Sequence, residues 1–134
     1  MKDLRKFIAT TIREYLNENT TTPHYSVDKD IKNSGFGEEI YKIKMFINDN
    51  EIGVLVLRIF LEKNKAEIMR VDIIDEYKGK GFGKQLYFKA KEIANNHNSN
   101  LYGGEIQTND AKQVWNSFIR NGMTKTDSDG NFYI

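Results

Sequence analysis

The sequence predicts an α/β (α+β) fold in which one domain spans residues 1–134. Strand-like segments follow one another between residues 39 and 74, and a glycine–lysine stretch then leads directly into a helix-length amphipathic segment. A length of 134 residues is enough for one hydrophobic core. No repeat, low-complexity segment or linker divides the chain, so we expect a single domain.

The N-terminal region is expected to contain one helix and a loop. Apolar residues at helical spacing predict an amphipathic helix over residues 3–18, with Leu4, Phe7, Ile8, Ile12, Tyr15 and Leu16 on one face. Residues 19–37 hold the only proline, Pro23, among Asn, Thr, Ser and Gly. This composition favours a loop, with room for a short strand at His24 to Val27.

Next, the pattern of residues 39–74 predicts three strands. Residues 39–47 alternate apolar and polar side chains, which is typical of a half-buried strand. Residues 52–61 are a nearly unbroken apolar run, as in a central strand covered on both faces. Glu67 to Ile74 would form the third strand, with Met69, Val71 and Ile73 on one side.

After the glycine–lysine stretch, the pattern predicts a helix, a short strand, a second helix and a hairpin. The first helix carries Phe82, Leu86, Ala90 and Ile93 on one stripe and ends between Asn95 and Asn100. The strand covers Leu101 to Thr108, and the second helix covers Asp110 to Asn121, with Ala111, Val114, Trp115, Phe118 and Ile119 facing inward. Gly122 would end that helix, and Met123 to Ile134 would form a hairpin around Asp129-Gly130.

The composition limits the classes of partner. Twenty basic residues balance 19 acidic ones, so the net charge of +1 does not favour a nucleic-acid or membrane partner. There are no cysteines, and the two histidines, His24 and His97, lie far apart, so we expect no metal site. No apolar run is long enough to span a bilayer, and the start of the chain does not resemble a signal peptide. We therefore expect a cytoplasmic protein.

The most informative motif is the stretch Lys78-Gly79-Lys80-Gly81-Phe82-Gly83-Lys84 at the start of a predicted helix. Glycines let consecutive main-chain N–H groups approach an anion, and a helix N-terminus adds free N–H donors. The spacing does not fit the dinucleotide fingerprint, because Lys84 stands where that motif requires a glycine. It does not fit the Walker loop either, because Gln85 stands where that motif requires Ser or Thr. The alternative is a flexible turn with solvated lysines.

This stretch resembles the cofactor loop of the GNAT superfamily, the acyl-CoA N-acyltransferases. The family pattern is Arg or Gln, two residues, Gly, one residue, and Gly or Ala; residues 78–83 fill it, with Lys78 in the first position. The preceding residues 71–77 and the order of elements after residue 38 also match, so the resemblance covers about residues 38–134. It implies a mixed, mostly antiparallel central sheet with helices on both faces, strands that splay apart at the cofactor site, and a shortened N-terminal region.

The resemblance also implies acetyl-CoA as co-substrate, without a metal. Val71 and Ile73 would offer backbone groups to the pantetheine arm and the thioester carbonyl. The main-chain N–H groups of Gly79, Lys80, Gly81, Phe82, Gly83 and Lys84 would hold the pyrophosphate, with Lys78 assisting. Asn109 resembles a family asparagine before the last helix, although it lies two residues early. It would contact the cofactor, and the alternative and simplest role is that of a helix N-cap.

Attack of an amine on a thioester requires a neutral amine, so a carboxylate base would help. Glu67 and Glu105 resemble the bases of two branches of the family, and we prefer Glu105 because its strand lies next to the expected cofactor cleft. The alternative for each is a solvated or salt-bridged glutamate on a strand.

This chain departs from the family pattern at two places: the residue that would give a proton to the departing thiolate, and the site that would bind the acceptor amine. Where many members carry a tyrosine, this chain has Phe118, which has no proton to give, so Tyr102, Tyr133 or water would have to serve. The short N-terminal region would leave the acceptor groove open or completed by a second copy in a homodimer. The sequence thus predicts acetyl transfer to a primary amine of a peptide, protein or small molecule. The alternative is a non-catalytic acyl-CoA-binding or protein-interaction module.

Overall fold

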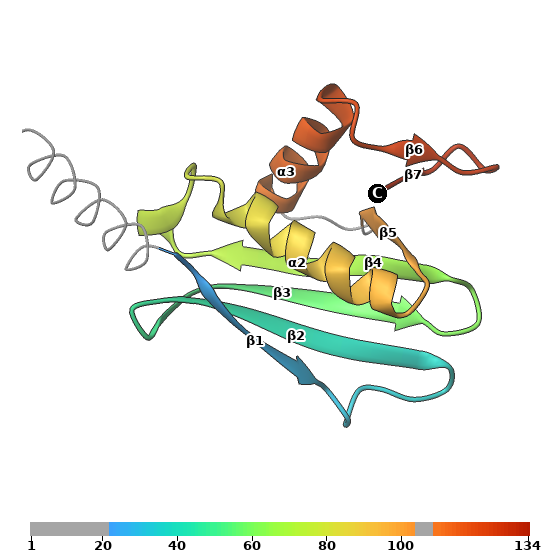
Figure 1. Cartoon of the computed structure of the whole chain (residues 1–134), viewed down its shortest axis with the longest axis horizontal. Coiled ribbons are helices and arrows are strands. Elements are labelled where there is room, and N and C mark those ends of the chain that lie inside the picture. The colour runs from blue at the N-terminus through green and yellow to red at the C-terminus, as the bar shows by residue number, and fades with distance from the viewer. Residues whose placement is uncertain (1–21, 104–108) are drawn as a thin grey trace, which may run out of the picture.

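The computed structural model describes residues 22–103 and 109–134 of the chain (Figure 1). The helix expected over residues 3–18 and the candidate base Glu105 lie outside these residues. The described elements are β1 (His24–Lys29), β2 (Glu38–Ile47), β3 (Asn50–Phe60), β4 (Lys65–Ile73), the short 3₁₀ helix η1 (Asp75–Tyr77), α2 (Phe82–Asn96), β5 (Asn100–Gly103), α3 (Asn109–Arg120), β6 (Lys125–Thr126) and β7 (Phe132–Tyr133).

The strands form one mixed sheet in the order β1-β2-β3-β4-β5-β7-β6. Every described pairing is antiparallel except that of β4 with β5, which is parallel. A parallel pair needs a crossover connection, and α2 supplies it between β4 and β5. The expected mixed, mostly antiparallel sheet is therefore confirmed.

The three strands predicted between residues 39 and 74 are present as β2, β3 and β4, joined by tight turns. Asn48, Asp49 and Asn64 adopt positive φ angles of 49°, 66° and 51° in these turns, a conformation that asparagine and aspartate tolerate better than most residues. In the region expected to be a loop, β1 extends from His24 to Lys29 and pairs with β2.

One side-chain assignment in β4 is wrong. We expected Met69 to share a face with Val71 and Ile73, but Met69 is 39% exposed while Ile68 is 2% exposed. The pairing of β4 with β3 shifts by one residue at this point, because Val56 is opposite Arg70 and Leu57 is opposite Ile68. A β-bulge of this kind adds one residue to the strand, so the side chains before the bulge point to the opposite face of the sheet from the one that simple alternation predicts.

The core lies between one face of the sheet and α2, which runs across β3 and β4 (Figure 1). Leu86, Ala90 and Ala94 are fully buried against the sheet. Gly53 of β3 allows the close approach of the layers, since a Cβ atom there would lie 2.6 Å from Ile73 Cδ1 and 3.3 Å from Leu86 Cδ1. The helix predicted from Phe82 onward is thus confirmed.

Helix α3 packs on α2 through aromatic side chains, as its predicted inward stripe requires. The ring centroids of Tyr87 and Phe118 lie 5.5 Å apart in an edge-on arrangement, and the Tyr87 hydroxyl donates to the Ala111 carbonyl over 3.3 Å. Gly122, with a φ of 68°, ends the helix. The N–H of Gly122 donates to the Ile119 carbonyl and that of Met123 to the Phe118 carbonyl, which is the Schellman arrangement.

A polar cluster joins β2 to the end of α2. The Tyr41 hydroxyl donates to the Glu39 carboxylate, and Lys29 Nζ lies 3.3 Å from the same side chain. His97 Nε2 lies 3.5 Å from Glu39 Oε2. The hydrogen bond from Tyr41 is the main reason why the pKa of Glu39 is lowered.

Among the described helices, none is long and apolar enough to cross a membrane.

Candidate functional site

The glycine–lysine stretch forms the connection from β4 to α2, by way of η1. Gly79 and Gly81 have φ angles of 74° and 84°. These lie in the left-handed region, which costs about 1–2 kcal/mol for a residue with a Cβ atom, so the glycines are required by the path of the chain. Gly81 is the N-cap residue of α2 and has no side chain to cap the helix.

The first turn of α2 therefore keeps free donors. The first helical hydrogen bond runs from the Gln85 N–H to the Gly81 carbonyl, over 3.2 Å. The N–H groups of Phe82, Gly83 and Lys84 precede it and meet no acceptor among the described residues. Together with the positive end of the helix dipole, these N–H groups form a site suited to an anion.

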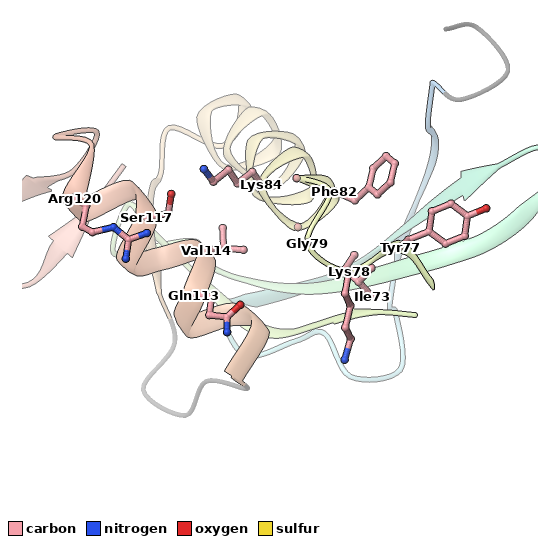
Figure 2. Close-up of a pocket in the computed structure, with 12 residues that line it drawn as sticks. Ile73, Tyr77, Lys78, Gly79, Phe82, Lys84, Gln113, Val114, Ser117 and Arg120 are labelled. Atoms are coloured by element: carbon pink, nitrogen blue, oxygen red, sulfur yellow. The ribbon is translucent and has the colours of Figure 1, made fainter. Parts of the chain in front are cut away.

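These donors open into a cleft of about 370 Å³ between the loop, the end of β4 and α3 (Figure 2). The cleft is lined by Ile73, Tyr77, Lys78, Gly79, Gly81, Phe82, Gly83, Lys84, Gln113, Val114, Ser117 and Arg120. Among the described residues, the lining contains three cationic side chains and no carboxylate. A negatively charged ligand is therefore the kind that this cleft would accept.

Gly83 keeps the cleft narrow where the two helices meet. A Cβ atom at this position would lie 3.0 Å from Val114 Cγ2, so the absence of a side chain lets α2 approach α3 closely. The loop lysines differ in their surroundings. Lys78 Nζ is 3.1 Å from Asp75 Oδ1, and Lys80 Nζ lies over the ring of Tyr77, 5.5 Å from its centroid, without lining the cleft.

The end of β4 adds main-chain groups to the same cleft. Parallel pairing of β4 with β5 covers only Lys65 to Ile68, opposite Asn100 to Gly103. The Ile74 N–H donates to the Ile52 carbonyl of β3. Because the peptide groups of successive strand residues point to opposite sides, those of Ile73 point away from β3, into the space where β4 and β5 no longer pair.

The structure places the other predicted site residues as follows. Val71 is buried in the core, and Asn109 is the exposed first residue of α3 and does not line the cleft. Glu67 is half-buried and pairs in register with Tyr102. It precedes Ile73 by six residues, which is about 20 Å along a strand. The roles of Glu67 and Glu105 as bases remain predictions.

Neither Phe118, at the position of the family tyrosine, nor the two tyrosines considered in its place offers a hydroxyl to this cleft. Phe118 is fully buried in the core. The Tyr102 hydroxyl donates to Asp127 Oδ2 over 3.0 Å, and burial together with this bond raises the pKa of Tyr102 to about 12. The ring of Tyr133 packs against that of Tyr102 in a tilted arrangement, with centroids 5.5 Å apart, and Tyr133 does not line the cleft. Water is the remaining donor among those we considered.

Five lining residues were missed by the sequence reasoning, among them Tyr77 of η1 and Val114 of α3. The other three, Gln113, Ser117 and Arg120, are polar and also lie on α3. Their spacing of four and three residues places them on one side of the helix. The sequence pattern identified the buried stripe of this helix, and the adjacent polar stripe was the signal that could have revealed the cleft wall.

Comparisons with known proteins agree with this geometry. The model of the acetyltransferase (GNAT) family matches residues 8–113. The chain belongs to the GNAT family. The resemblance to that family is thereby confirmed, although the match begins before residue 38, where we had placed its start, and ends at residue 113. Acyl transfer is the chemistry of the family as a whole. No curated protein matches the chain at a significant level.

Solved GNAT structures share the fold. An IAA acetyltransferase from Bacillus cereus superimposes with a TM-score of 0.53 at 20% identity, covering 78% of this chain and 79% of that one. A Bacillus subtilis acetyltransferase in complex with CoA gives 0.52 at 18% identity, over 78% and 79% of the two chains. The ribosomal-protein-S18-alanine N-acetyltransferase from Escherichia coli gives 0.52 at 12% identity, over 76% and 68%.

Proposed function

We propose that this GNAT protein is an N-acetyltransferase that moves an acetyl group from acetyl-CoA to a primary amine, without a covalent enzyme intermediate. The acceptor would be a small molecule or an amine of a peptide or protein. The observation that carries the proposal is the cleft at the start of α2, which free main-chain N–H groups and three cations line and to which no described residue contributes a carboxylate.

The residues of the cleft suit the parts of this co-substrate. The N–H groups from Gly79 to Lys84 would hold the diphosphate, as helix N-termini hold phosphates elsewhere. The peptide groups of Ile73 would bond the pantetheine arm as an added strand does. The Bacillus subtilis acetyltransferase, which has the same fold, contains CoA.

In the reaction, the amine nitrogen forms a bond to the thioester carbonyl carbon and the C–S bond breaks. The amine loses a proton to a base, for which Glu105 and Glu67 are the candidates, and the departing thiolate takes up a proton from water. Chemistry of this kind needs neither a covalent enzyme intermediate nor a residue with a free hydroxyl at position 118. We further propose that the protein works in the cytoplasm, as its composition suggests.

Calorimetry with acetyl-CoA and with CoA tests the binding step, and thioester turnover against a panel of amines and peptides tests the transfer. We expect binding in the micromolar range and turnover with at least one class of amine. Failure of the wild-type protein to bind any acyl-CoA would refute the proposal.

A second candidate is a non-catalytic acyl-CoA-binding module. It is favoured by Phe118, which occupies the position of the family tyrosine without offering a proton, and by the Tyr102 hydroxyl, which is engaged by Asp127. Tight binding of acetyl-CoA by the wild type with no turnover of any amine or peptide would support this candidate.

A further inference from the structure

Strand β1 lies at one end of the sheet, and among the described strands only β2 pairs with it. The ladder between the two continues past β1, because the Asp30 N–H donates to the Ile40 carbonyl over 2.7 Å. In an antiparallel ladder, residues that bond the neighbouring strand alternate with residues that do not. Counting back from Asp30, the main-chain groups of Tyr25, Val27 and Lys29 therefore point outward, away from β2.

This outer edge of β1 is not blocked by a proline or a bulge, two features that keep natural strand edges from pairing. The strand has six residues, its register with β2 shows no bulge, and Pro23 lies just before it. Val27, in the middle of the edge, is 40% exposed. Helix α2 lies mainly over β3 and β4, so it leaves the edge accessible. A further strand could therefore be added here.

We propose that β1 pairs with β1 of a second copy of this chain, in antiparallel fashion, with the two-fold axis at Val27. Tyr25 would then form a hydrogen-bonded pair with Lys29 of the other copy, and Val27 with Val27. Each such pair exchanges two bonds, so the three pairs supply about six main-chain hydrogen bonds. The side chains match as well, because the Lys29 cation lies beside the Tyr25 ring and the two valines are in contact. On the other face, Ser26 meets the Asp28 carboxylate.

The sequence of β1 favours this register over its two neighbours. If the axis moved by one residue to Asp28, the two Asp28 carboxylates would face each other, which is unfavourable. If it moved to Ser26, Lys29 would face Pro23, which has no N–H to donate. Only the axis at Val27 avoids both penalties, and this self-complementarity is the reason to infer a second copy rather than an unrelated strand.

Sedimentation velocity of the full chain over a range of concentrations tests the association. A pair of edge strands buries less than a standard interface, so we expect a dimer with a Kd of about 10 µM to about 1 mM. Val27→Pro removes the outward N–H at the axis and no bond to β2, and Val27→Lys places two cations there. Met69→Lys is the matched control, because Met69 is 39% exposed on β4, which is not at the edge of the sheet. Dimerisation should weaken at least about tenfold in both Val27 variants and stay unchanged in the control.

Single cysteines test the register, because the chain contains no cysteine of its own. In the proposed dimer the Cα atoms of the two Val27 residues would lie about 5.5 Å apart, which a disulfide can bridge. The two Ser26 residues would be diagonal neighbours, about 7–8 Å apart, which is too far. Under mild oxidation we therefore expect Val27→Cys to form a covalent dimer and Ser26→Cys to remain a monomer.

Three results would overturn the inference. The first is a wild type that stays monomeric at every concentration, as it would if another segment of the same chain covered the edge. The second is a dimer that persists unchanged in both Val27→Pro and Val27→Lys, and the third is equal cross-linking of Val27→Cys and Ser26→Cys. Thermal unfolding shows whether each variant is folded, and Val27→Lys keeps the test decisive should Val27→Pro be unstable. None of these measurements involves CoA, so their failure would leave the proposed function standing.

Discussion

Replacing Gly81 with alanine separates the role of the glycine loop in folding from its role in binding. Gly81 has a φ of 84°, and a Cβ atom placed there would meet nothing within 4 Å. Gly130, in the turn between β6 and β7, matches it closely, with a φ of 83° and equally open surroundings. Gly130→Ala is therefore a control with the same backbone strain at a position far from the cleft in sequence.

The two substitutions should destabilise the fold by similar amounts. An alanine held in the left-handed region costs about 1–2 kcal/mol, and for a domain of this size each kcal/mol lowers the melting temperature by about 3–5 °C. Only Gly81→Ala should weaken CoA binding, because relief of the strain rotates the N–H groups that begin α2. Loss of one charge-assisted hydrogen bond to a phosphate is about 1.5–3 kcal/mol, which is at least about tenfold in Kd.

Calorimetry with CoA and thermal unfolding of the wild type and both variants provide the data. The reasoning would be refuted if Gly81→Ala bound CoA with wild-type affinity while losing stability. It would also be refuted if Gly130→Ala weakened CoA binding as much as Gly81→Ala did.

Three further predictions concern other parts of the molecule. Gly53→Ala would place a Cβ atom 2.6 Å from Ile73 Cδ1, so we expect a loss of about 1–3 kcal/mol, measured by denaturant unfolding; an unchanged midpoint would contradict it. Glu39 has a lowered pKa because Tyr41 donates a hydrogen bond to it, so its contribution is present above the unfolded pKa and is lost as the pH falls. Glu39→Gln should therefore lower the melting temperature at pH 7, by an amount that shrinks on acidification below about pH 4.5; a difference independent of pH would show that the ionised carboxylate of Glu39 is not the source of the stabilisation. Phe118→Tyr adds a hydroxyl to a fully buried ring, so it should destabilise the protein by about 1–3 kcal/mol without raising turnover; a stable variant with a higher kcat would show that position 118 can act as the acid.

The strands and helices of the described region followed from local patterns, because alternation and helical spacing report which side of an element is buried. Met69 shows where this reasoning ends. Apolar residues stand at both positions 68 and 69, and only the pairing with β3 decides which of them faces the core. The bulge that exposes Met69 depends on the partner strand, so no pattern within β4 alone predicts it.

The candidate site was predictable where the backbone conformation depends on the residue type. Glycines at 79 and 81 do adopt positive φ angles, and the motif that contains them pointed to the start of α2. Ser117 and Arg120 were not predicted, because their place in the cleft depends on how α3 packs against α2. That packing depends on the aromatic contacts of Tyr87 and on the missing side chain of Gly83, which are tertiary features.

The central claim is that main-chain N–H groups between Gly79 and Lys84 hold the diphosphate of CoA. An amide NMR titration of the ¹⁵N-labelled chain tests it most directly, with CoA as ligand and phosphate-free pantetheine as the comparison. We expect CoA to shift the resonances of Gly79, Gly81 and Gly83 strongly and pantetheine to leave them nearly unchanged, with Gly130 unaffected by either. If CoA bound without moving these three glycine resonances, or pantetheine moved them equally, the claim would be contradicted.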